Sequence, residues 1–165
     1  MKRIIFIFAV LFSVAAFHAR ADGCLNSCDR GIIASCMVLE AAGEGTEGMQ
    51  AVLNVILNRA KGDLSLLVPV TVKRGAFSCM SSVWNIDIPD YSPLLSHAQN
   101  QPESFADAMN LIAIMEQGLL MDNTGGATHY HADYVTPYWI SDMRYLTSIG
   151  RHRFYIEHER QVASL

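Results

Sequence analysis

Apolar residues dominate positions 31–39, and the run ends at the acidic residue Glu40. The run predicts a buried helix over residues 32–40. Gly43 and Gly45 follow closely and are expected to break this helix. The carboxyl group of Glu40 is therefore expected where an apolar helix meets solvent.

Helical spacing returns after these glycines. Thr46 is predicted to cap the next helix, with Glu47 in its first turn. A further helix is predicted to open at residues 100–103, where Pro102 suits the first turn. The apolar faces of these two helices are formed by Met49, Leu53, Ile56 and Ala60, and by Phe105, Met109, Ile112, Met115 and Leu119.

Between these helices, residues 64–101 show no regular period and include Pro69, Pro89 and Pro93. The segment is predicted to be irregular. An irregular segment of this length is usually functional or tied down by a disulfide.

The pattern changes after the loop signal at residues 122–126. Three segments, 127–134, 145–149 and 152–156, are rich in aromatic and β-branched residues and predict short strands, the last two joined around Gly150. The predicted fold class is α+β, mostly helical with a small antiparallel β-sheet in the C-terminal part.

Residues 1–21 have the order of a secretory signal peptide: a basic start, an apolar stretch, and Ala19-Arg20-Ala21 as the cleavage pattern. Residues 22–165 are then expected to form a single domain in the periplasm or outside the cell. No later segment is long and apolar enough to span a membrane. The formal net charge is −4 and becomes more negative without the leader, which argues against a nucleic-acid partner.

The four cysteines all lie beyond the leader: Cys24, Cys28, Cys36 and Cys79. An even number outside the cytoplasm predicts two disulfides and no free thiol, with three possible pairings. Cys24 and Cys28 could pair locally, and Cys36 and Cys79 could tie the first helix to the middle segment. A zinc cluster is the alternative, but the usual two-plus-two spacing is missing.

Glu40 and Glu44 are the first candidates for chemistry. Desolvation at the end of an apolar helix favours the protonated form of a carboxyl group, which can then act as a general acid. Cleavage of a sugar–sugar bond needs such an acid. The alternative is a solvated helix end, where glutamates are common.

The second candidate group is Thr128-His129-Tyr130-His131-Ala132-Asp133. On a strand, His129, His131 and Asp133 point one way and Tyr130 the other. The histidine face could ligate a metal or form a polar wall that hydrogen-bonds sugar hydroxyls, and we favour the polar wall. His152 and His158 are further candidates for either role. Trp139 is expected in the core.

These blocks, in this order, resemble the SleB/CwlJ family of cell-wall hydrolases. The matching segments are residues 40–45, 51–59, 75–78, 125–131, Trp139 and residues 149–155. The resemblance implies a lysozyme-like catalytic domain that acts on the glycan strands of peptidoglycan, with Glu40 as the catalytic acid. It further implies a lytic transglycosylase that cuts between N-acetylmuramic acid and N-acetylglucosamine and leaves a 1,6-anhydro sugar.

Within the matching blocks, Glu44, Ser78, Tyr130 and His131 are predicted to contact substrate. No metal or other cofactor is expected, and the protein is expected to be a monomer. Two alternatives remain: a metal-dependent amidase built on His129, His131 and Asp133, and a wall-binding protein in which Glu40 is inert.

Overall fold

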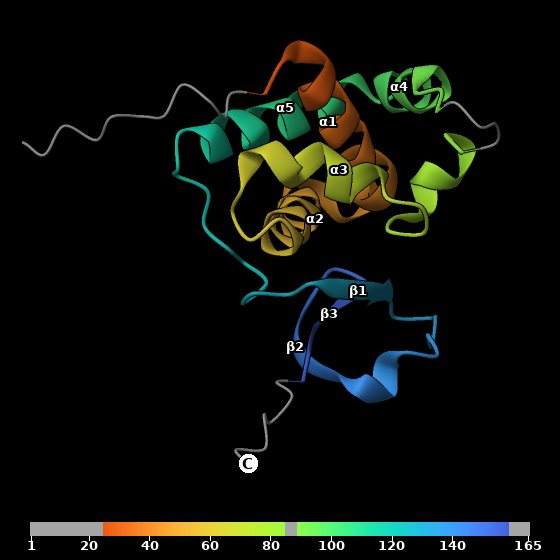
Figure 1. The fold of residues 1–165 in the computed structure, drawn as a ribbon, viewed down its shortest axis with the longest axis vertical. Helices are drawn as coiled ribbons and strands as arrows, with labels where there is room; N and C mark the ends of the chain where they lie inside the picture. Colours follow the sequence, from red (N-terminus) through yellow and green to blue (C-terminus); the bar gives the residue numbers. More distant parts are fainter. Residues whose placement is uncertain (1–24, 85–88, 159–165) are drawn as a thin grey trace, which may run out of the picture.

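A computed structural model describes residues 25–84 and 89–158. Helices form one lobe and a three-stranded antiparallel sheet forms the other (Figure 1). The α+β prediction is therefore confirmed. Within the described residues, no helix is long and apolar enough to cross a membrane.

Helix α1 (Ser27–Ala41) is central to the helical lobe. It begins with a capping box in which Asn26 and Asp29 each accept a hydrogen bond from the other's backbone N–H. Almost all of its residues from Gly31 to Val38 are apolar and buried, because other helices cover it on several sides. These neighbours are α2 (Gly45–Arg59), α4 (Ser92–Gln99) and α5 (Pro102–Glu116).

Helix α2 joins the two lobes. The predicted face of Met49, Leu53, Ile56 and Ala60 is buried in the helical core, as expected. Ala51 and Val55 lie on a second buried face, which packs against Phe154 and Ile149 of the sheet. The predicted cap at Thr46 is wrong, since α2 already includes Gly45 and the Thr46 hydroxyl donates to Asp107 instead.

The prediction that residues 64–101 are irregular is wrong. The segment contains α3 (Leu67–Val72) and α4, together with the short 3₁₀ helices η3 (Leu64–Leu66) and η4 (Ser78–Ser82). Helices of six and eight residues are too short to display a period, and the prolines within them suggested a loop. In α4 the proline occupies the first turn, where its missing N–H costs no hydrogen bond.

The sheet has the order β1-β3-β2 and consists of β1 (His129–Ala132), β2 (Met143–Ile149) and β3 (His152–Glu157). Strand β3 pairs with both neighbours in antiparallel register. Gly150 lies in the β2–β3 turn with φ 54°, which a glycine adopts readily. All three strands confirm the predicted ones to within a few residues. The short 3₁₀ helix η5 (Ile140–Asp142) precedes β2.

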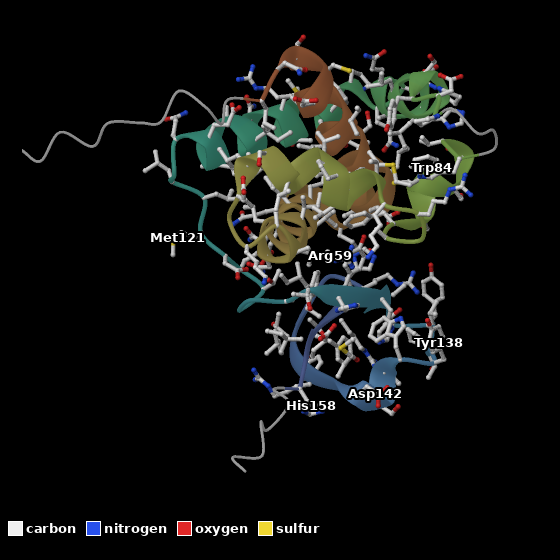
Figure 2. All side chains as sticks on the ribbon, viewed as in Figure 1. Arg59, Trp84, Met121, Tyr138, Asp142 and His158 are labelled. Carbon is white, nitrogen blue, oxygen red and sulfur yellow. The ribbon has the colours of Figure 1, made fainter. Side chains whose placement is uncertain are left out.

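Polar side chains on α2 fix the start of β1. The Asn54 amide donates to the Met121 carbonyl, and the Asn58 amide donates to the Ala127 carbonyl. The Arg59 guanidinium donates to the carbonyl of Thr128 at 2.7 Å and to that of Ala76 at 3.1 Å. Figure 2 shows Arg59 between the helices and the sheet. These contacts hold the segment before β1 against α2, and Tyr130 of β1 then reaches Glu40 in the last turn of α1.

Candidate functional site

The Glu40 carboxyl group lies in the last turn of α1, half-buried, where three donors meet it. Its Oε1 accepts hydrogen bonds from the Ser78 hydroxyl and the Cys79 backbone N–H, both at 2.8 Å. Its Oε2 accepts from the Tyr130 hydroxyl, also at 2.8 Å. Donors from η4 and from β1 therefore hold this carboxyl group in one orientation.

Tyr130 points from β1 toward the helices, and its hydroxyl donates a hydrogen bond to Glu40. Its ring contacts Phe77, His152 and Phe154, with centroid separations of 6.4, 5.1 and 5.6 Å. Burial, and then the charge of Glu40, raise the pKa of Tyr130 well above its usual value. The hydroxyl therefore stays protonated and available to the carboxyl group at neutral pH.

The three partners of Glu40 differ in what they allow. The Cys79 backbone N–H can only donate, so Oε1 must remain an acceptor. The Tyr130 hydroxyl can donate to a carboxylate or accept from a protonated acid. A protonated Glu40 is therefore expected to carry its proton on Oε2, beside Tyr130. This arrangement suits a group that gives up a proton and later takes one back.

Glu44 links the two lobes. It does not contact the Glu40 carboxyl group or the three donors around it. It lies in the 3₁₀ helix η2 (Ala42–Glu44), and its Oε2 accepts from the Arg151 backbone N–H at 2.9 Å. Gly150 and Gly48 leave room for this side chain: a Cβ atom on Gly150 would overlap Glu44 Oε2, and one on Gly48 would overlap the Glu44 Cβ. The carboxylate thus ties η2 to the β2–β3 turn.

His131 is placed away from Glu40. It is buried and stacks on Tyr155, with ring centroids 5.2 Å apart. Its Nδ1 lies 2.8 Å from the Ala132 carbonyl and its Nε2 lies 3.0 Å from the Tyr155 hydroxyl. Strand alternation explains the result, because His131 and Tyr130 must face opposite sides of β1.

The same alternation puts His129 with His131, and both rings contact Trp139. Asp133 instead forms an ion pair with Arg151 at 3.5 Å. Across residues 25–84 and 89–158, no group of three His, Cys, Asp or Glu side chains is arranged to hold a metal ion.

His152 is a site residue that the sequence suggested only in passing. Its ring packs against Tyr130, and its buried Nδ1 has no hydrogen-bond partner in the structure. Burial lowers the pKa of His152, and the charges of Glu44 and Glu40 oppose that shift. The ring is therefore neutral at pH 7, and it lies close enough to interact electrostatically with both carboxyl groups.

Cys36 and Cys79 are free thiols in the structure, with Sγ atoms 3.8 Å apart. A disulfide requires about 2.0 Å, so the predicted bond is not formed here, although α1 and η4 bring the two residues together. Burial, followed by the hydrogen bond with Cys79, raises the pKa of the Cys36 thiol well above its usual value. Cys28 is exposed, and its predicted partner Cys24 lies outside the described residues, as does the predicted signal peptide.

A cavity of about 830 Å³ opens between the lobes on the other side of Tyr130. Its walls come from the C-terminal end of α2, the turn after α3, β1, and the loop that carries Tyr138 and Trp139. Tyr138 is exposed on the sheet side of this opening (Figure 2). Trp139 was expected in the core and instead forms a half-buried wall of the cavity.

Comparisons with known proteins identify one family by sequence and one fold by structure. The sequence matches the Cell Wall Hydrolase family over residues 43–155, a segment that starts just after Glu40. The fold is similar to the catalytic domain of the germination-specific lytic transglycosylase SleB from Bacillus anthracis, with a TM-score of 0.52 and 24% identity over 80% of this chain and 97% of that one. The catalytic domain of Bacillus cereus SleB gives a TM-score of 0.50 and 24% identity over 84% of this chain and 99% of that one. The comparison with curated proteins finds no match.

Proposed function

The chain belongs to the cell wall hydrolase family, and from that premise we propose that it is a lytic transglycosylase that cleaves peptidoglycan glycan strands with Glu40 as its single acid and base. The observation that carries this proposal is the arrangement around Glu40. Three donors from two different elements hold its carboxyl group at the boundary of the two lobes. The similar fold of the Bacillus anthracis SleB catalytic domain, a lytic transglycosylase, supports the same reaction class.

In the proposed reaction, Glu40 gives the proton on Oε2 to the oxygen that leaves C1 of the muramic acid. The bond from C1 to that oxygen breaks through an oxocarbenium-like transition state. The 6-hydroxyl of the same sugar then attacks C1, and its proton returns to Glu40. The product is a 1,6-anhydro sugar, water is not consumed, and no second carboxylate is required.

The partners of Glu40 have distinct roles in this scheme. The Cys79 N–H keeps Oε1 as an acceptor, so the mobile proton stays on Oε2, and the Ser78 hydroxyl adds a second hydrogen bond to Oε1. Ser78 is exposed and can also reach a sugar hydroxyl. Tyr130 stabilises the carboxylate that forms after the first proton transfer. Glu44 and His131 contribute to substrate binding indirectly, because Glu44 holds the β2–β3 turn and His131 packs against Trp139, which lines the cavity.

Product analysis tests this proposal. The purified protein is incubated with purified peptidoglycan in the presence of a chelator, and the released fragments are analysed by mass spectrometry. We expect anhydro-muropeptides. Fragments that end only in reducing muramic acid would show that water is the nucleophile, and loss of activity with the chelator would favour the metal-dependent amidase.

We also propose that the protein acts as a monomer in the periplasm or outside the cell, after removal of residues 1–21. In that oxidising environment Cys36 and Cys79 would lose two protons and two electrons to a disulfide oxidant by thiol–disulfide exchange. The bond would fix η4, whose Cys79 N–H holds Glu40. Thiol labelling of the exported, denatured and unreduced protein should find no free cysteine; labelling of two or more would contradict this.

A further inference from the structure

The cavity beside Tyr130 is strongly basic in an otherwise acidic chain. Beyond residue 21 the sequence has only two lysines, Lys61 and Lys73, and both line this cavity. Arg59 and Arg74 line it as well, and the single acidic residue in its wall is Glu157. The formal net charge of the chain is −4, so this concentration of positive charge is local.

The two arginines are already engaged. Arg59 donates to two backbone carbonyls and lies 4.8 Å from the Phe77 ring centroid, and Arg74 lies 4.9 Å from that of Trp84. The two lysines differ, because both are exposed and no ion pair within the described part of the chain includes either of them. Their ammonium groups are therefore available to a ligand.

Lys61 lines this cavity from an unusual backbone conformation. Lys61 follows the end of α2 with φ 54°, and it is the one residue other than glycine in the described chain with a positive φ. A side chain in this conformation costs about 1 kcal/mol, and glycine normally takes the position after a helix. Lys73 lines the same cavity from the turn that follows α3.

The remaining wall is aromatic. Tyr138 and Trp139 line the cavity together with His129, whose ring lies 5.4 Å from that of Trp139. Burial, and then the charge of Arg59, lower the pKa of His129, so the ring stays neutral and adds no charge. A volume of about 830 Å³ falls within the range of sites that enclose a small ligand or short peptide.

Tyr130 connects this cavity to the reacting bond. Tyr130 lines the cavity, and its hydroxyl contacts Glu40. A group that fills the cavity must therefore be attached close to the sugar on which Glu40 acts. In peptidoglycan, the acidic peptide stem is attached to the muramic acid, whose C1 is the reacting atom in the proposed mechanism.

We propose that this cavity is the binding site for the peptide stem, with Lys61 and Lys73 pairing with its free carboxylates. The inference rests on the proposed function and adds a substrate class to it: glycan strands that carry acidic stems. Strands without peptides, and strands whose stem carboxylates are amidated, lack the charges that the two lysines would pair with.

Binding to an inactive form tests the inference separately from cleavage. In a Glu40→Gln background, we would measure by calorimetry the affinity for a disaccharide–tetrapeptide and for the same disaccharide without peptide. The variant Lys61→Gln/Lys73→Gln should weaken binding of the tetrapeptide form about tenfold, as expected for the loss of two solvent-exposed ion pairs. Added salt should reduce the affinity of the parent protein for the tetrapeptide form more than it reduces the affinity of this variant.

The matched control is Arg144→Gln/Arg153→Gln, which removes the same charge from two exposed positions that do not line the cavity. This control should bind the tetrapeptide form as the parent does. Equal affinity of the lysine variant and the parent would overturn the inference, and so would an equal loss for the disaccharide without peptide. Cleavage by the wild-type protein is a separate result, so a charge-dependent interaction without any cleavage would refute the proposed function alone.

Discussion

The Glu40 carboxyl group depends on contacts with residues far from it in the sequence. The Ser78 and Cys79 donors come from η4 and the Tyr130 donor comes from β1. The Tyr130 hydroxyl is the donor whose removal is easiest to interpret. Its ring packs against Phe77 and Phe154, and a phenylalanine at this position keeps that packing.

Tyr130→Phe should lower kcat about 10- to 100-fold, which corresponds to the loss of a hydrogen bond to a charged group. KM and the melting temperature should change little, because the ring packing remains. Tyr134→Phe is the control, since Tyr134 is exposed and its hydroxyl does not contact Glu40. Equal kcat values for the two variants and the wild type would show that the Tyr130 hydroxyl has no part in the reaction.

Individual site residues were predictable to different degrees. The position of Glu40 followed from the end of an apolar run, and strand alternation correctly separated His131 from Tyr130. Both residues were predicted to contact substrate; the Tyr130 hydroxyl contacts Glu40, whereas His131 packs against Tyr155 and Trp139. The contacts of Ser78 and Cys79 with Glu40 join segments 38 and 39 residues apart, which no local pattern reveals.

Among the elements, η2 and the β2–β3 turn link the two lobes through Glu44. Glu44 accepts the Arg151 N–H, and it fits because Gly150 has no side chain. Gly118 provides a comparison, since its φ of 70° is also positive but nothing lies within 4 Å of an added Cβ atom.

Gly150→Ala should therefore destabilise the protein more than Gly118→Ala does. Both variants carry the cost of a left-handed side chain, about 1–2 kcal/mol. Only Gly150→Ala also displaces Glu44 and breaks its hydrogen bond, which adds about 1–3 kcal/mol. Denaturant unfolding of both variants measures the difference, and equal destabilisation would show that the link between the lobes contributes nothing.

Long periodic elements could be predicted, whereas short ones could not. Helices α1, α2 and α5 each have 15 residues, enough for several repeats of an apolar face. Helices α3 and α4 are held mainly by packing against other elements, which the local sequence does not display. Trp139 was misplaced for a related reason, because a tryptophan that lines a cavity resembles a core tryptophan in sequence.

The molecule as a whole is expected to lose stability in mild acid. The pKa of His152 is lowered in the folded state, mainly by burial, and that of His129 is lowered in the same direction. The unfolded chain therefore binds these protons more readily than the folded one. Stability is complete above the ordinary histidine pKa of about 6.5 and decreases as the pH falls below it.

Thermal unfolding of the wild type at pH 7.5 and pH 5.5 checks this expectation. The melting temperature should be lower at pH 5.5, and His152→Gln should reduce the difference because one of the two titrating rings is absent. An equal decrease in melting temperature for the wild type and His152→Gln would show that protonation of His152 does not cause the loss of stability. Burial acts to raise the pKa of Asp122, but its hydrogen bonds with Thr124, Gly126 and Asn58 together lower it, so Asp122 loses its contribution to stability only at more acidic pH.

The central claim is that Glu40 is the proton donor and acceptor of the reaction. Glu40→Gln preserves the contacts, because the amide oxygen can accept from Cys79 and the amide nitrogen can donate to the Tyr130 hydroxyl. It cannot supply an acidic proton. Glu44→Gln is the matched control, and we expect a milder loss from it, since its amide oxygen can still accept the Arg151 N–H.

The decisive measurement is the rate at which each variant clears purified cell walls, taken together with its melting temperature. For Glu40→Gln we predict a rate at least about 10²- to 10⁴-fold below that of the wild type, the usual contribution of general acid–base catalysis, with an almost unchanged melting temperature. A folded Glu40→Gln protein that clears walls at close to the wild-type rate would contradict the account.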